Sequence, residues 1–181
     1  HTFHDVRGEQ REQLLILVDT KGNKIGTATR EICHTGEGKP HLAFMAFVLD
    51  ENNNIILTQR SAKKSLWGGF WDASVVSHVL SGETPEEAAK RRGREELGIE
   101  VDFRDAGAFY YFAKHGESAE NEYCHVLIGK TKKEIFPNPV EISDTKTIPL
   151  AKLKEEIKQS PEKFTPWLLA ALNRFDLTRF I

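Results

Sequence analysis

Residues 77–99 read SHVLSGETPEEAAKRRGREELGI and form the most informative stretch of the chain. Its middle predicts a helix, because Thr84 is placed as the N-cap, Pro85 as the first helical residue, and Glu87 completes a Thr-x-x-Glu capping box. Gly98 is placed to end the helix. Gly93 is a weak point inside it, costing roughly 1 kcal/mol relative to alanine. The stretch therefore predicts one well-delimited helix.

This predicted helix has two distinct faces. A narrow stripe of small or apolar side chains recurs at i, i+4 and i+8, at Ala89, Gly93 and Leu97, and such a stripe favours close packing on a sheet. Arg92, Glu95 and Glu96 stand at i, i+3 and i+4 and share another face, and Glu83 precedes the helix. The charged face is consistent either with a solvated surface or with a Mg²⁺ or Mn²⁺ site, since these ions take oxygen ligands and bridge to phosphates.

The sequence on either side of this helix predicts strands, turns and two further helices. The predicted strands span residues 14–19, 25–29, 41–50, 55–60, 71–79, 108–112 and 122–129. The predicted loops span residues 34–40 and 61–70, and the further helices span 148–157 and 165–175. Many strands, one capped internal helix and helices at the end predict an α+β domain with a layered mixed sheet.

Composition narrows the class of protein. The 181 residues, 39% hydrophobic and 29% charged, fit one domain over residues 1–181 that can bury a core; residues 1–10 are expected to be a disordered or added N-terminal segment. A net charge of −2 argues against a strongly basic nucleic-acid binder. Two cysteines exclude a disulfide scaffold and are compatible with a reducing compartment, so a cytoplasmic location is expected. No apolar run reaches the roughly 20 residues of a membrane span, so no membrane association is expected.

The stretch from Ser77 to Ile99 resembles the Nudix box, Gly-x5-Glu-x7-Arg-Glu-U-x-Glu-Glu-x-Gly-U, in which U is aliphatic. Three positions depart from it: Ser77 replaces the first Gly, Arg92 a Glu, and Gly93 the aliphatic residue. The matching residues are Glu83, Arg91, Glu95, Glu96, Gly98 and Ile99. The resemblance implies action on a diphosphate with a divalent metal, but the arginine at position 92 removes one expected metal ligand.

A longer resemblance, from about Leu14 to Phe175, is to type 1 isopentenyl-diphosphate isomerases, which share the Nudix fold. It implies a Nudix-type α/β/α sandwich with a mixed β-sheet. It also implies one metal site built from His34, His41, His78, Glu120 and Glu122. The residue types agree, because carboxylates two apart on a strand project from one face, and three imidazoles with carboxylates favour Zn²⁺, Mn²⁺ or Fe²⁺ over a pure Mg²⁺ site. Mn²⁺ or Zn²⁺ is therefore expected there.

The isomerase resemblance also implies a substrate site for a small prenyl-like diphosphate. By this resemblance its basic contacts are Arg30, Arg60, Lys64 and Arg92. The planar guanidinium group of arginine and the ammonium group of lysine both bind phosphate oxygens well. By the same resemblance, Glu96 holds a Mg²⁺ that arrives with the diphosphate, aided by Glu83 or Glu95. Trp167 matches an aromatic residue of the hydrocarbon pocket, where its ring can stabilise a carbocation-like state.

Isomerisation needs acid/base groups on opposite sides of the substrate, since one proton is added and another removed. In the resembled family these are a Cys and a Glu helped by a Tyr. The Glu corresponds to Glu122 and the Tyr to Tyr111, whereas the Cys position is occupied by Val76, which can exchange no proton. Ser77 is a poor substitute because neighbouring strand residues point to opposite faces, and neither Cys33 nor Cys124 occupies the family's position.

Three functions remain open. The first is an isopentenyl-diphosphate isomerase with altered acid/base machinery, favoured by the metal-ligand and basic sets and opposed by Val76. The second is a Nudix hydrolase of a small organic or nucleoside diphosphate, favoured by Glu95 and the absent cysteine and opposed by Arg92. The third is a non-catalytic binder of diphosphates or metal. The isomerase is the interpretation adopted, with the hydrolase as its alternative.

Overall fold

Strand β3 (His41–Leu49) lies at the centre of the computed structural model, which describes residues 13–181. All nine of its residues are buried, which explains why its apolar run shows no alternation: both faces are covered. Four strands pair with β3. Three are antiparallel to it, β1 (Leu14–Val18), β4 (Ile55–Arg60) and β6 (Val75–His78), and one is parallel, β8 (Ser118–Lys130).

The remaining strands extend the sheet outward from these partners. They are β2 (Lys24–Thr29) on β1, β5 (Trp71–Asp72) and β9 (Ile142–Ile148) on β4, and β7 (Arg104–His115) on β8. All four of these pairings are antiparallel. The parallel pairing of β3 with β8 therefore makes this nine-stranded sheet mixed, as the sequence predicts.

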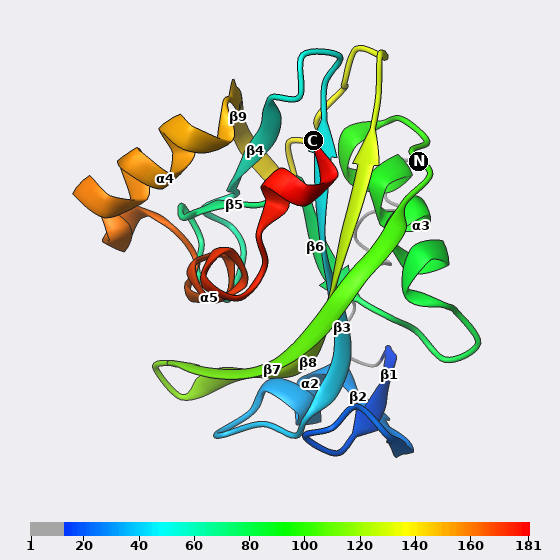
Figure 1. Cartoon of the computed structure of the whole chain (residues 1–181). Coiled ribbons are helices and arrows are strands. Elements are labelled where there is room, and N and C mark those ends of the chain that lie inside the picture. Colours follow the sequence, from blue (N-terminus) through cyan, green and yellow to red (C-terminus); the bar gives the residue numbers. More distant parts are fainter. Residues whose placement is uncertain (1–12) are drawn as a thin grey trace.

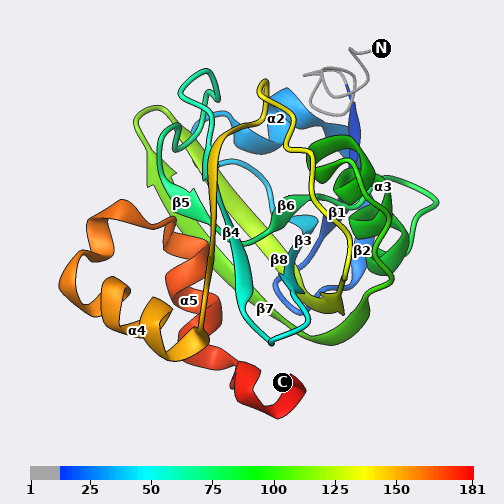
Figure 2. The same ribbon diagram turned by 90° about the horizontal axis from the view of Figure 1, so that it is seen from above.

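Helices cover both faces of the sheet (Figures 1 and 2). Helix α3 (Pro85–Leu97) lies over one face, where Ala89 and Leu97 pack with Phe44 in one hydrophobic core. Helices α4 (Leu150–Gln159) and α5 (Pro166–Arg174) lie over the other face, where Trp167 packs with Met45 in a second core. The two cores share β3, whose neighbouring residues point alternately into each. The predicted α/β/α arrangement is confirmed.

Helix α3 forms from the local signals that predict it. The Thr84 hydroxyl accepts a hydrogen bond from the Glu87 amide at 3.1 Å, and the Glu87 carboxylate accepts one from the Thr84 amide at 2.9 Å. The helix ends at Gly98, whose φ of 70° is left-handed, a conformation that favours glycine. The capping residues thus fix both ends of the helix.

Several parts of the chain differ from the sequence prediction. A short helix, α2 (Arg30–His34), follows β2, with Thr29 as its N-cap. The predicted strand over residues 71–79 is two strands, β5 and β6, because they pair with different partners on either side of the buried Ser74. Strand β9 is not predicted at all. The C-terminal part also holds two 3-10 helices, η1 (Pro161–Lys163) and η2 (Leu177–Phe180).

The N-terminal segment predicted over residues 1–10 lies outside the described residues. Within residues 13–181, none of the helices has the length and apolar character that a membrane span requires.

Candidate metal centre and active site

The structure gathers three histidines and two glutamates from four separate elements. The ligand atoms that they offer all lie within 4.8 Å of one another, and all five residues are buried: His34, His41, His78, Glu120 and Glu122. His34 ends α2, His41 begins β3, His78 ends β6, and the two glutamates lie on one face of β8. Sheet register explains the convergence, because His41 stands opposite Glu122 and Ala43 stands opposite His78.

Each imidazole directs its Nε2 atom at a carboxylate. The Nε2 atom of His34 lies 2.9 Å from the Oε1 atom of Glu120. The Oε2 atom of Glu122 lies 3.4 Å from the Nε2 atom of His41 and 3.3 Å from that of His78. The three ring centroids are 4.8 to 5.0 Å apart, so the rings converge on a single point.

The second ring nitrogens of two histidines are fixed by the backbone. The Nδ1 atom of His34 lies 2.7 Å from the carbonyl oxygen of Arg30, and that of His41 lies 2.8 Å from the carbonyl oxygen of Lys39. Such contacts place the proton on Nδ1 and leave Nε2 as a metal ligand. The Nε2 atom of His41 is buried and makes no hydrogen bond. A divalent cation fits this site, because it would use that nitrogen and compensate two adjacent carboxylates.

Burial and neighbouring charges set the protonation of the ligands. Burial lowers the pKa of His78 well below its usual value, helped by the neighbouring imidazoles, so its ring is neutral. Burial also acts to lower the pKa of His34, but the Glu120 carboxylate outweighs it and the pKa of His34 is raised. Burial opposes ionisation of Glu122, yet contacts with the His41 ring and the Tyr111 hydroxyl lower its pKa. Without metal, His34 therefore keeps its proton to a higher pH than a free imidazole does, and that proton compensates part of the carboxylate charge.

Tyr111 is placed as an oriented partner of Glu122. It stands opposite Glu122 in the β7–β8 pairing, and its hydroxyl donates a hydrogen bond to the Oε1 atom of that carboxylate. Burial, and next to it the Glu122 charge, raises the pKa of Tyr111 well above its usual value. The phenol therefore stays protonated and remains a donor.

Val76 and Ser77 lie on opposite faces of the sheet. Val76 pairs with Met45 and packs in the core that contains Trp167, whereas Ser77 pairs with Phe44 of the other core. Since strand side chains alternate, Val76 shares its face with His78 of the cluster. The position that the resemblance assigns to the family's cysteine thus faces the same side as the clustered histidines and glutamates, and Ser77 does not.

The Nudix-box carboxylates lie outside the five-residue cluster and are engaged by arginines of the same helix. Glu83 lies 2.6 Å from Arg91, which also reaches the carbonyl oxygen of His78 at 3.4 Å. Arg92 is fully buried, with its guanidinium 2.9 Å from Glu95 and 2.8 Å from Glu96. A second metal at Glu96, aided by Glu83 or Glu95, remains a prediction.

The four basic residues predicted to bind a diphosphate do not form a separate, uncompensated basic surface. Arg92 also lies 3.4 Å from Glu141, and Lys64 lies 2.6 Å from the same oxygen of Glu141. Arg60 donates to the carbonyl oxygens of Leu66 and Trp67 and lies 3.7 Å from Asp72. Arg30 begins α2 beside His34, whose ring contacts the Arg30 carbonyl. Carboxylates of the protein thus pair with Lys64 and Arg92, and one lies near Arg60.

Trp167 lies inside the core rather than on an open wall, at 1% exposure. Its ring centroid is 5.0 Å from that of Trp67 and 6.2 Å from that of Tyr111, and the Arg60 guanidinium lies over its face at 5.3 Å. Trp67 has a φ of 51°, an unusual conformation for a bulky residue. Contact of Trp167 with a hydrocarbon chain remains a prediction.

Sequence reasoning did not identify three residues of this region: Trp67, Asp72 and Glu141. Asp72 had a signal, since it is a charged residue inside an apolar extended segment. Glu141 had none, because its partners Lys64 and Arg92 lie far from it in the sequence. Trp67 stands in a glycine-containing loop, where an aromatic residue alone carries little information.

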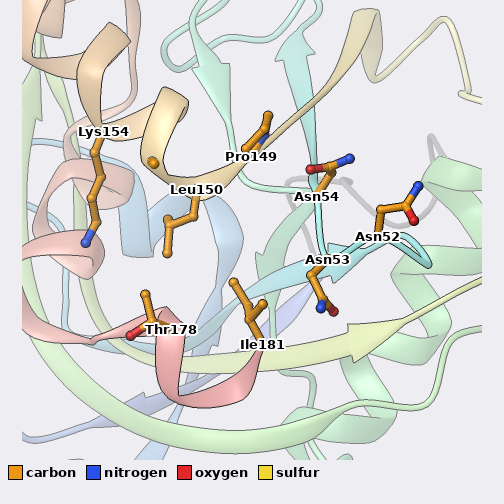
Figure 3. A pocket seen from close by; sticks show the side chains of 9 residues that line it. Asn52, Asn53, Asn54, Pro149, Leu150, Lys154, Thr178 and Ile181 are labelled. Atoms are coloured by element: carbon orange, nitrogen blue, oxygen red, sulfur yellow. The ribbon is translucent and has the colours of Figure 1, made fainter.

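A surface hollow lies away from this region (Figure 3). It has a volume of about 460 Å³ and is bounded by the β3–β4 turn, the start of α4 and the C-terminal residues. Asn53, Leu150, Lys154, Thr178 and Ile181 contribute to its lining. None of the predicted site residues lines it.

Comparison with known proteins agrees with this fold. The model of the NUDIX domain matches residues 39–168. A protein of Photorhabdus laumondii named isopentenyl-diphosphate Delta-isomerase 2 is 37% identical over 163 residues, covering 90% of this chain and 92% of the relative. A protein of Haloarcula marismortui named isopentenyl-diphosphate Delta-isomerase is 36% identical over 178 residues, covering 94% of this chain and 95% of the relative.

A solved structure shows the same fold. A crystal structure of a protein from Deinococcus radiodurans superimposes with a TM-score of 0.66 at 26% identity, covering 81% of this chain and 90% of that one. The chain therefore belongs to the Nudix family and, within it, to the group of the isopentenyl-diphosphate isomerases.

Proposed function

We propose that this protein is a metal-dependent enzyme that interconverts isopentenyl and dimethylallyl diphosphate, acting in the cytoplasm. The observation that carries the proposal is the buried cluster of three histidines and two glutamates, with Tyr111 donating a hydrogen bond to Glu122. Relatives with the isomerase name align over most of the chain, which supports the same substrate class. The metal is Mn²⁺ or Zn²⁺ at the cluster, with Mg²⁺ arriving on the diphosphate.

The proposed reaction moves a double bond without changing the formula of the substrate. One proton is added to the terminal carbon of the double bond, and another is removed from the carbon next to the diphosphate-bearing carbon. Glu122 exchanges one of these protons, and Tyr111 holds the carboxylate in place. A bound divalent cation supplies positive charge that keeps the Glu120 and Glu122 carboxylates together. Because Val76 cannot exchange a proton, we expect a slow reaction.

The substrate is held by charge-assisted contacts of its diphosphate. Arg30, Arg60, Lys64 and Arg92 are the proposed basic contacts, with Glu96 and either Glu83 or Glu95 as ligands of the Mg²⁺. In this proposal Lys64 and Arg92 exchange their contacts with Glu141 for contacts with the diphosphate. The Mg²⁺ that accompanies the diphosphate would then supply the positive charge that compensates the Glu141 carboxylate.

A hydrolase is the alternative, and the valine at position 76 favours it. To separate the two, purified protein is incubated with isopentenyl diphosphate and Mg²⁺ plus Mn²⁺ in heavy water. Dimethylallyl diphosphate carrying one deuterium in a methyl group would support the isomerase. Released phosphate or isopentenyl monophosphate would support the hydrolase. If neither product forms and nucleoside diphosphates are also unchanged, both enzyme functions are overturned and a binding function is supported.

A further inference from the structure

Asp72 is a carboxylate in an environment that disfavours its charge. It lies in β5 between Trp71 and Ala73 and is 2% exposed. Burial raises the pKa of Asp72, while Arg60 and the hydrogen bonds that it accepts act in the opposite direction. A carboxyl group is retained at such a position only if its surroundings compensate the cost of burial.

The groups around Asp72 are all hydrogen-bond donors. Its oxygens accept from the Trp167 indole Nε1 at 2.9 and 3.0 Å, from the Thr165 hydroxyl at 3.1 Å and from the Ala73 amide at 2.8 Å. The Arg60 guanidinium lies 3.7 Å away. Three donors and a cation favour the ionised carboxylate, because a protonated acid would turn a donor of its own toward them.

The fold alone does not require a charge at this position. Helix α5 is attached to β5 by the Thr165 amide, which donates to the Trp71 carbonyl at 2.9 Å, and it is held in the core by the buried Leu168 and Ala171. A neutral acceptor could receive the indole N–H at a lower desolvation cost. The carboxylate therefore supplies something beyond attachment of the helix: it compensates the Arg60 charge and it raises the electron density of the indole.

An indole that donates to a carboxylate is polarised, which makes its ring face more negative and a better partner for a cation. The Trp167 ring already attracts one cation, since the Arg60 guanidinium lies 5.3 Å above it. The ring is also next to Tyr111, at 6.2 Å between centroids, and Tyr111 bonds Glu122. The polarised ring is thus one aromatic residue away from the proposed acid/base.

We propose that Asp72 is a positioning residue of the active site, which fixes the Trp167 indole and makes its ring face more attractive to positive charge. This inference rests on the proposed function, because the positive charge to be stabilised is the one that develops when isopentenyl diphosphate is protonated. Asp72 itself touches no substrate in this proposal and acts through Trp167.

The kinetic test is a double-mutant cycle of Asp72→Asn with Trp167→Phe. Asp72→Asn removes the charge at constant size, and Trp167→Phe keeps an aromatic ring but removes the N–H. We expect Asp72→Asn to lower kcat by about tenfold or more with little change in KM. In the Trp167→Phe background the same substitution should change kcat less than twofold. Equal losses in both backgrounds would overturn the proposal.

A binding measurement separates failure of this inference from failure of the proposed function. The probes are an alkyl diphosphate that carries a tertiary ammonium and its neutral carbon isostere, compared by calorimetry in the metal-loaded protein. Asp72→Asn should reduce the preference for the ammonium probe about fivefold or more, even if the parent protein isomerises nothing. An unchanged preference would contradict the role of Asp72. Thr165→Val, which removes a different donor to Asp72, is the matched control and should preserve the preference.

A third measurement needs no substituted protein. In a ¹⁵N spectrum of the unaltered chain, the Trp167 indole proton should lie downfield of the Trp67 and Trp71 indole protons, because its acceptor is a carboxylate. A resonance at the position of a solvated indole would show that the bond is absent and would overturn the proposal.

Discussion

At the scale of single residues, the side of the sheet that Val76 faces decides whether a substituted side chain at this position can reach the proposed site. It shares that face with His78 of the histidine and glutamate cluster and packs in the core that contains Trp167. A side chain of similar size that can exchange a proton would therefore point toward the proposed site without repacking the sheet.

We expect Val76→Cys to increase the rate of deuterium incorporation into dimethylallyl diphosphate by about tenfold or more, since a positioned acid/base group contributes roughly 10²–10⁴-fold. The matched control is Ser77→Cys, which places the same thiol on the opposite face, against Phe44, and should give no increase. Equal rates for the parent and both variants, all folded and metal-loaded, would contradict the isomerase interpretation of this position.

Glu141 offers a second prediction at this scale. Its carboxylate is buried and contacts both Lys64 and Arg92, so Glu141→Gln leaves two cations with less compensation. We expect the free energy of unfolding to fall by about 1–3 kcal/mol and the affinity for inorganic diphosphate to rise, because the anion replaces the lost charge. Thermal unfolding with and without diphosphate measures both effects.

The control for this prediction is Glu156→Gln. Glu156 pairs with Lys146 at the same N–O distance of 2.6 Å, but both side chains are more than 30% exposed. Exposed pairs contribute about 0–1 kcal/mol, so neither the stability nor the diphosphate affinity should change measurably. A Glu141→Gln variant that behaves like this control would show that Glu141 does not hold the basic residues.

At the scale of elements, helix α3 contains one glycine, Gly93, and ends at another, Gly98, and the two have opposite requirements. A Cβ atom added at Gly93 would meet nothing closer than the Ile99 carbonyl oxygen at 3.8 Å. At Gly98, where φ is 70°, it would lie 3.0 Å from the Phe136 Cβ atom and 3.1 Å from its carbonyl oxygen. Gly93 therefore lowers the stability of the helix, whereas Gly98 is needed for the left-handed conformation that ends it.

Gly93→Ala should therefore raise the free energy of unfolding by about 0.5–1 kcal/mol. Gly98→Ala, the matched substitution at the other glycine, should lower it by about 1–3 kcal/mol, because it forces a left-handed alanine against Phe136. Urea unfolding measures both. A loss of stability in Gly93→Ala would show that the stripe facing the sheet has no room for a methyl group.

These elements also show how far the sequence predicts the fold. Helix α3 is predictable because Thr84, Glu87 and Gly98 act within a few residues of one another. The division between β5 and β6 is not, because it depends on pairing with β4 and β3, and β9 lacks the alternation that marks a strand. For the site, the family resemblance supplies the five clustered residues. The sequence marks Asp72 as a charged residue in an apolar segment, but its partner Trp167, like both partners of Glu141, is distant in the sequence.

At the scale of the whole molecule, the His34–Glu120 pair links stability to pH. The pKa of His34 is raised in the folded protein, so in the metal-free form its contribution is fully present below the unfolded-state pKa and is lost as pH rises through the folded-state value. A metal ion must displace the same proton, so its apparent affinity rises with pH.

We therefore expect the difference in Tm between Mn²⁺-loaded and chelator-treated protein to grow as pH rises from about 5.5 to 8.5. His34→Gln should flatten this dependence. His125→Gln, which alters a partly exposed histidine paired with Asp105, is the control and should leave the dependence intact. A Tm difference that is independent of pH in the unaltered protein would contradict a metal site containing His34.

The parallel pairing of β3 with β8 has a consequence for how the molecule opens. The five clustered histidines and glutamates come from α2, β3, β6 and β8, and His34 lies 86 residues from Glu120 in the sequence. A cation bound there would link strands β3, β6 and β8, which long stretches of chain connect. None of these strands could then separate from the sheet while the ion kept all of its ligands. The rate of metal release would then report the opening of the sheet itself.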